Sequence, residues 1–246
     1  MNGGTAKQAR SVTVPDHVYG FPGVAFGGYL AGLLAREVPG GSAKVSFHRP
    51  TPVGRPVELR ERERGGRELV HGDAVLTSAR PCAPVSAPDR LPSWREAERA
   101  GRELARTGPL DGGDCFACNT ERATGRGLRQ LFAPLPEHSR AVAVWTPEPA
   151  LYPGGDALPA ELVWAGLDCP GGWVSRLFGG APANTVTASL SATLLHPVQV
   201  GVEHLVLGWP ITRSGRKHLV GSAILTRTGT LCATAEALWL APAARR

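Results

Sequence analysis

The sequence GRELVHGDAVLT at residues 66–77 returns later in the chain as GRKHLVGSAILT at residues 215–226. The two stretches align without a gap. Each begins with Gly-Arg and a polar residue, and each continues into a segment that contains Gly-x-Ala, then Val or Ile, then Leu-Thr. Self-similarity at this length is typical of a chain built from repeated structural units. The pair therefore indicates that a unit containing a strand has been duplicated.

Two further matches occur upstream and in the same order. A Pro-x-x-x-Gly turn is present at residues 50–54 and again at residues 197–201, in each case between two strand-like runs. A Gly-Gly-aromatic sequence is present at residues 27–29 and again at residues 171–173, and each is predicted to open an apolar helix. Since the three matches keep their order, we interpret the chain as two copies of one unit.

Each copy is predicted to contain one helix followed by an antiparallel sheet. In the first copy, Tyr29, Leu30, Leu33 and Leu34 recur at helical spacing. Strands are predicted in this copy at residues 44–48, 57–62 and 69–77. In the second copy they are predicted at residues 185–195, 203–209, 217–226 and 231–240.

These elements predict an α+β chain with the plan of a double hotdog, in which two helix-wrapped antiparallel sheets are fused. A single hotdog leaves a sheet edge open, and fusion covers that edge within one chain. The first unit is predicted at residues 12–80 and the second at residues 112–243. Residues 81–111 are predicted to be a linker with a short helix, because Ser93 and Glu96 fit a capping box.

Composition excludes several classes of protein. Of the 246 residues, 42% are hydrophobic and 20% are charged, which is ordinary globular usage. The net charge is +6, but there is no basic block or zinc-finger spacing to indicate nucleic-acid binding. No apolar run approaches the length of a membrane span, and no signal peptide is expected at the polar start.

The chain has five cysteines, an odd number spread widely, which does not fit a secreted disulfide framework. Reduced thiols and a cytoplasmic location are expected. Cys115 and Cys118 have Cys-x-x-Cys spacing, but a structural zinc needs four ligands and the sequence shows no second close Cys or His pair. No metal and no cofactor are therefore predicted.

Several segments resemble known proteins. The segments FGGYLAG, SFHRP and LHP, at residues 26–32, 46–50 and 195–197, resemble the acyl-CoA thioesterase II family. Other segments are similar to an uncharacterised group of actinobacterial thioesterase-fold proteins. They are CFAC at residues 115–118, WAGLDCP at 164–170, GW at 208–209 with GRK at 215–217, and ALW at 237–239. The resemblance implies a double-hotdog thioesterase acting on acyl-CoA or acyl carrier protein thioesters.

The thioesterase II resemblance also implies a catalytic triad of Asp, Thr and Gln in the second half, which orients the attacking water. Asp168 matches the Asp at the start of the second helix, and Thr187 matches the Thr ten residues before the turn proline, Pro197. The Gln position falls on Ala237. The resemblance therefore supplies two members of the triad.

Chemistry favours helix N-termini as the place where a thioester carbonyl is polarised, because their free N–H groups can bind an oxyanion. Glycine in the first turn allows close approach of an acyl group. The pairs Gly27–Gly28 and Gly171–Gly172 are the predicted sites of this kind. The aromatic residues that follow them, Tyr29 and Trp173, are predicted to contact substrate, and Arg216 and Lys217 are predicted to bind the phosphates of the carrier.

The predicted function is acyl thioester hydrolysis, with water oriented by Asp168 and assisted by Thr187. Two alternatives stay open because the Gln is missing. One is a hotdog dehydratase or cyclase acting on a polyketide-like intermediate, and the other is a non-catalytic acyl-binding module. Further assembly into a homo-oligomer stays possible for each of them.

Overall fold

The computed structural model describes residues 10–88, 90–108 and 113–243. The predicted boundary between linker and second unit, at residues 111–112, lies outside these ranges. The helices are α1 (Gly27–Ala35), α2 (Trp94–Thr107) and α3 (Ala160–Leu177), and short 3-10 turns lie at Glu63–Gly65, Pro136–His138 and Pro149–Leu151. No helix of the described chain is long and apolar enough to cross a membrane.

Most of the strands form one 11-stranded antiparallel sheet with the order β1-β5-β6-β7-β4-β10-β13-β12-β11-β9-β8. Their bounds are β1 Arg10–Thr13, β4 Ser42–Phe47, β5 Pro56–Glu61, β6 Arg67–His71, β7 Ala74–Pro81, β8 Ala133–Leu135, β9 Arg140–Trp145, β10 Val186–Leu194, β11 His204–Ser214, β12 Lys217–Thr226 and β13 Leu231–Leu240. A separate small ribbon pairs β2 (Tyr19–Phe21) with β3 (Val24–Ala25).

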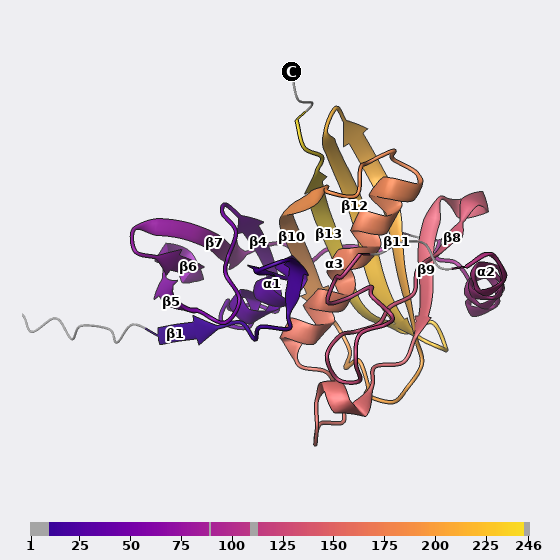
Figure 1. Ribbon diagram of the computed structural model, residues 1–246, viewed down its shortest axis with the longest axis horizontal. Helices are drawn as coiled ribbons and strands as arrows, with labels where there is room; N and C mark the ends of the chain where they lie inside the picture. Colours follow the sequence, from indigo (N-terminus) through magenta and orange to yellow (C-terminus); the bar gives the residue numbers. More distant parts are fainter. Residues whose placement is uncertain (1–9, 89, 109–112, 244–246) are drawn as a thin grey trace, which may run out of the picture.

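The strand order shows the duplication directly. The first half runs β5-β6-β7-β4, and the second half runs β11-β12-β13-β10 when it is followed inward from the opposite side. The halves meet where β4 pairs with β10, and there the hydroxyls of Ser42 and Thr193 form a buried hydrogen bond of 2.9 Å. Figure 1 shows the two halves on either side of this junction. The predicted plan of two units joined edge to edge is confirmed.

The second half follows the predicted strands closely, and β12 and β13 have the predicted bounds. The first half differs at residues 69–77, where one strand was expected and the chain instead forms the β6–β7 hairpin. The turn is at Gly72 and Asp73, and Gly72 has a φ of 59°. Its sequence match, Gly221, lies inside β12. A left-handed glycine ends a strand whereas an extended one continues it, so the same residue type gives two outcomes.

The predicted start of the second helix is wrong. α3 begins at Ala160, and Gly171 and Gly172 lie well inside it. Pro159 is the N-cap residue of α3. Glu161 lies in the first turn, where the helix dipole stabilises a carboxylate. Proline lacks an N–H and disfavours helix interiors, yet Pro170 is buried within α3. The packing of α3 against both α1 and the sheet outweighs this local cost.

Helices α1 and α3 cross in close contact and run in opposite directions. A Cβ on Gly28 would lie 2.7 Å from Asp168 Cβ, and a Cβ on Gly32 would lie 2.4 Å from Glu161 Cα. These two glycines, one turn apart on α1, therefore let the two backbones touch. The contact places the start of α1 beside the middle of α3 (Figure 1).

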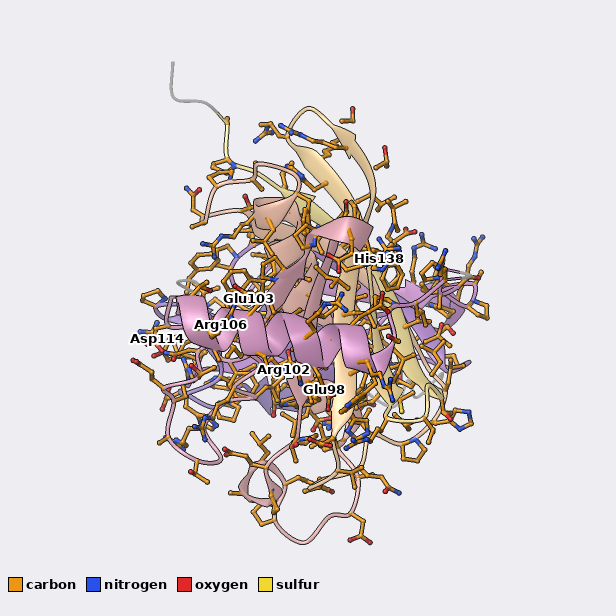
Figure 2. The ribbon with its side chains drawn as sticks, turned by 90° about the vertical axis from the view of Figure 1, so that its right-hand side faces the viewer. Glu98, Arg102, Glu103, Arg106, Asp114 and His138 are labelled. Atoms are coloured by element: carbon orange, nitrogen blue, oxygen red, sulfur yellow. The ribbon has the colours of Figure 1, made fainter. Side chains whose placement is uncertain are left out.

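The second-half sheet is covered on both faces. Along β11, Val206 joins the core beneath α3, while Leu205 and Leu207 pack in a separate cluster with α2. Burial on both faces agrees with the continuous apolar runs at residues 205–209 of β11 and 223–225 of β12. Figure 2 shows α2 lying across this outer face, with Arg102 and other charged side chains along the helix. Ser93 and Glu96 form the predicted capping box at its start.

Candidate active site

Asp168 projects from the middle of α3 towards the start of α1. Its side chain is buried, with the residue only 1% exposed. The Thr187 hydroxyl on β10 donates a hydrogen bond of 2.8 Å to Asp168 Oδ1, and the backbone N–H of Gly28 donates to the same carboxylate. The structure therefore brings together the Asp and Thr of the predicted triad. It places them at the N-terminus of α1, not at the start of the helix that carries Asp168.

The first turn of α1 supplies the positive end of a helix dipole beside this carboxylate. Gly27 opens the helix, and a Cβ on it would lie 3.2 Å from Asp168 Oδ2. Phe26 at the N-cap makes no side-chain hydrogen bond to the first turn. N–H groups in the first turn have no partners within the helix. The site thus joins a helix N-terminus from the first half to a carboxylate and hydroxyl from the second.

Burial controls the acidity of Asp168. Loss of water raises its pKa from the usual 3.8 to about 7, and the hydrogen bonds from Thr187 and Gly28 partly oppose that rise. A carboxyl group of this acidity can take up and return a proton near neutral pH.

A cavity of about 760 Å³ opens beside the pair. Gly27 and Phe47 from the first half, and Asp168, Thr187 and Trp239 from the second, lie on its wall. The volume is within the range of small-molecule sites. Most of the wall is apolar, with the basic side chains of Arg49 and Arg176 also lining it. The shape and lining suit an apolar group whose polar end reaches Asp168.

The strand position expected to carry the missing Gln is filled differently. Ala237 is buried but does not line the cavity, whereas Trp239, two residues along β13, does. Trp239 pairs with Thr187 across the sheet. A Cβ on Gly171 would lie 2.6 Å from Trp239 Nε1, and a Cβ on Gly172 would lie 2.8 Å from Trp239 Cη2. These glycines therefore make room for an indole, and they do not form a helix N-terminus.

The other predicted contacts divide between the cavity and the surface. Trp173 lines the cavity, and Arg176 stacks over its ring at 4.7 Å. Within the described chain, the wall includes neither Tyr29 nor Arg216 nor Lys217. Tyr29 packs edge-on against Phe116, and Arg216 and Lys217 are exposed at the β11–β12 hairpin, where Arg216 donates to the Ala241 carbonyl. Predictions of substrate contact by these three residues find no support from the cavity.

Three cysteines also meet at the cavity wall. Cys115 and Cys118 come from the loop after α2, and Cys169 follows Asp168 on α3. The sulfurs of Cys115 and Cys169 are 3.4 Å apart. Hydrogen bonds from the neighbouring thiols hold the pKa of Cys115 below its usual range, and the same contacts raise the pKa of Cys169. Sequence reasoning missed this group because the third cysteine is distant in the chain.

Several solved structures share this fold. The tesB protein of Mycobacterium avium subspecies paratuberculosis is 18% identical, with a TM-score of 0.58 over 89% of this chain and 88% of that one. The acyl-CoA thioesterase II TesB2 of Mycobacterium marinum is 15% identical, with a TM-score of 0.57 over 96% and 94% of the two chains. A hot dog fold protein of unknown function from Alicyclobacillus acidocaldarius is 12% identical, with a TM-score of 0.52 over 98% and 96%.

No protein-family description and no curated protein sequence matches the chain. These three structures are each less than 20% identical to this chain, so what they show is the architecture. Together with the strand order, they confirm the predicted double hotdog.

Proposed function

We propose that this protein hydrolyses acyl thioesters carried by CoA or by an acyl carrier protein. The observation that carries the proposal is the pairing of the buried Asp168 with Thr187 at the N-terminus of α1, on the wall of a cavity of about 760 Å³. The arrangement offers a base, an anion-stabilising helix end and apolar space in one place. Its likeness in fold to proteins described as thioesterases supports the same activity.

In the proposed reaction, a water molecule lies beside the hydrogen-bonded Asp168 carboxylate and Thr187 hydroxyl, within reach of both. Since Thr187 donates its proton to Asp168, its lone pairs are available to accept from water. Asp168 removes a proton from the water while the water oxygen attacks the thioester carbon. The tetrahedral intermediate then collapses, the C–S bond breaks, and the protonated Asp168 returns its proton to the leaving thiolate. The products are a carboxylic acid and a free thiol.

The carbonyl oxygen is proposed to face the first turn of α1, where backbone N–H groups stabilise the charge that develops on it. Gly27 lines the cavity at this point, and its lack of a side chain leaves the backbone accessible. The acyl chain would lie along the apolar wall that includes Phe47 and Trp173. Arg49 and Arg176 line the cavity, so they replace Arg216 and Lys217 as proposed contacts for the carrier phosphates.

A non-hydrolytic reaction is the second candidate, and the position of Trp239 favours it. The indole stands opposite Thr187, and it can donate a hydrogen bond but cannot accept one. An indole therefore holds the attacking water less firmly than the Gln side chain of the triad would. The base, Asp168, and the cavity are both still present. A dehydration or cyclisation of a polyketide-like thioester would use the same Asp168 as a base.

The test compares the wild-type protein with Asp168→Asn on a panel of short, medium and aromatic acyl-CoAs and a carrier-bound thioester. Turnover is followed by loss of the thioester absorbance, since thiol reagents would also react with the five cysteines. Loss of a general base lowers turnover by roughly 10²- to 10⁴-fold. Asp73→Asn is the matched control, because Asp73 is exposed in the β6–β7 turn.

Hydrolysis that is lost in Asp168→Asn and retained in Asp73→Asn supports the proposal. Products that keep the thioester but lose water or form a ring would support the second candidate. Tight binding of acyl-CoA by the wild-type protein with no conversion of any substrate would assign the chain to acyl binding and refute both reactions. A matching circular dichroism spectrum shows that the Asp168→Asn protein is folded.

A further inference from the structure

Three thiols converge at one point of the molecule from two separate segments. Cys115 and Cys118 lie in the loop that follows α2, and Cys169 lies on α3. The three Sγ atoms all lie within 4.8 Å of one another, with Cys115 and Cys169 at 3.4 Å. The reaction proposed above uses none of them.

The loop that carries two of these thiols is fixed by its own contacts. The N–H of Phe116 donates to the Tyr19 carbonyl at 3.0 Å, and the N–H of Gln130 donates to the Ala117 carbonyl at 2.9 Å. The N–H of Ala117 also points at Cys115 Sγ, at 3.4 Å. These backbone hydrogen bonds hold the loop around Cys115, and an N–H aimed at its sulfur stabilises a thiolate.

The dimensions of the group suit a tetrahedral thiolate-bound ion. A zinc–sulfur bond of about 2.3 Å places two ligand sulfurs roughly 3.8 Å apart in a tetrahedral site. The sulfur of Cys115 is 3.4 Å from that of Cys169, and no pair in the group is more than 4.8 Å apart. Small side-chain adjustments would bring all three to bonding distance around one centre.

The number and spacing of the thiols favour an ion over a disulfide. A disulfide joins two sulfurs at about 2.05 Å and would leave the third thiol unused. Two cysteines at Cys-x-x-Cys spacing and a third from another element form a set of soft ligands typical of zinc. In the described part of the chain, no His, Asp or Glu side chain joins the group. All three cysteines line the cavity, so a fourth position would open into it.

We propose that Cys115, Cys118 and Cys169 bind one thiophilic divalent cation, zinc by preference, with its fourth coordination position facing the cavity. Water or an oxygen or sulfur atom of a bound ligand fills that position. Binding displaces the thiol protons, and the ion bonds to the resulting thiolates, so no oxidant or reductant takes part. The site links the loop after α2 to α3 at the wall of the cavity.

The experiment uses the full chain, reduced and freed of metal by a chelator, and titrates it with cobalt(II) alone. Thiolate ligands give intense charge-transfer absorption with cobalt, which is a readout independent of any thioester turnover. One ion per chain is expected, and zinc should displace the cobalt. Elemental analysis of the protein as purified measures the bound zinc separately.

Cys169→Ser is expected to weaken binding by at least roughly 100-fold, since even outer-shell changes at metal sites cost up to that amount. Cys82→Ser is the matched control, because Cys82 is a half-buried free cysteine outside the group. If Cys169→Ser does not fold, the wild-type protein still decides the question. Zinc should protect Cys115, Cys118 and Cys169, but not Cys82, from alkylation mapped by peptide mass spectrometry.

Absence of cobalt and zinc binding would overturn the proposal, as would binding that is unchanged in Cys169→Ser. A peptide map that shows a disulfide between Cys115 and Cys169 in the protein as purified would also overturn it. Loss of thioester hydrolysis has no bearing on these measurements, so the two proposals fail separately.

Discussion

Changing Gly28 to alanine tests the close crossing of α1 and α3. The added Cβ would lie 2.7 Å from Asp168 Cβ and 2.8 Å from both Ala165 Cα and the Trp164 carbonyl oxygen. Ordinary contacts of this kind lie at 3.4–4 Å. Two of the three neighbours are backbone atoms that cannot rotate away, so the helices must separate by more than about half an ångström.

The expected cost comes from two opposing effects. Overpacking against a rigid neighbour costs about 3 kcal/mol at the upper end of its usual range. Alanine improves intrinsic helix propensity by about 1 kcal/mol relative to glycine. The net loss in the free energy of unfolding is then about 2 kcal/mol, which lowers Tm by roughly 4–8 °C in a chain of this size.

Gly101→Ala is the matched control for Gly28→Ala. Gly101 is exposed inside α2, and a Cβ there would meet nothing within 4 Å. Only the propensity effect remains, so Tm should rise by roughly 2–4 °C. Thermal unfolding followed by circular dichroism measures both variants. If Gly28→Ala is as stable as Gly101→Ala, the two helices do not cross as closely as described.

Three other perturbations have defined outcomes. Thr187→Val should lower thioester turnover by roughly tenfold to a hundredfold, because a hydrogen bond to a charged group is lost. Thr187→Ser keeps the hydroxyl and should retain most of the turnover. Equal rates for the two variants would show that Thr187 takes no part in the site. The pKa of Glu96 is lowered from 4.5 to about 2, chiefly by hydrogen bonds from Ser93. The ionised Glu96 therefore stabilises the fold fully above pH 4.5, and this contribution is lost as the pH falls toward 2. Glu96→Gln should flatten this pH dependence of the free energy of unfolding, measured by urea unfolding at a series of pH values. An unchanged dependence would contradict the capping role. Free zinc at 100 times its dissociation constant should stabilise the fold by about 2.7 kcal/mol. A chelator should reverse this rise in stability in a thermal scan. A Tm that zinc does not change would count against the three-cysteine site.

The duplication could be predicted from sequence because three groups of matching residues recur in the same order in both halves. The strands β12 and β13 also have the predicted bounds. The β6–β7 hairpin could not be predicted in the same way. Gly72 and Gly221 stand at matching positions, and only the surrounding structure decides that Gly72 turns the chain.

The candidate site was predicted in part. Asp168 and Thr187 were identified through resemblance, and the structure joins them by a hydrogen bond. The start of the second helix was predicted at Gly171 because the Gly-Gly-aromatic sequence of residues 27–29 recurs at residues 171–173. The start signal at Pro159 and Glu161 was present in the sequence, but the packing that carries α3 through Pro170 is tertiary and has no local signature.

The ends of the 11-stranded sheet affect how the protein behaves at high concentration. A long antiparallel sheet is a template on which further chains can polymerise, and its terminal strands decide whether they do. Here those strands are β1, of four residues, and β8, of three. β8 also contains Pro134, which has no N–H to offer an incoming strand. Addition of a further strand at the β8 end is therefore disfavoured.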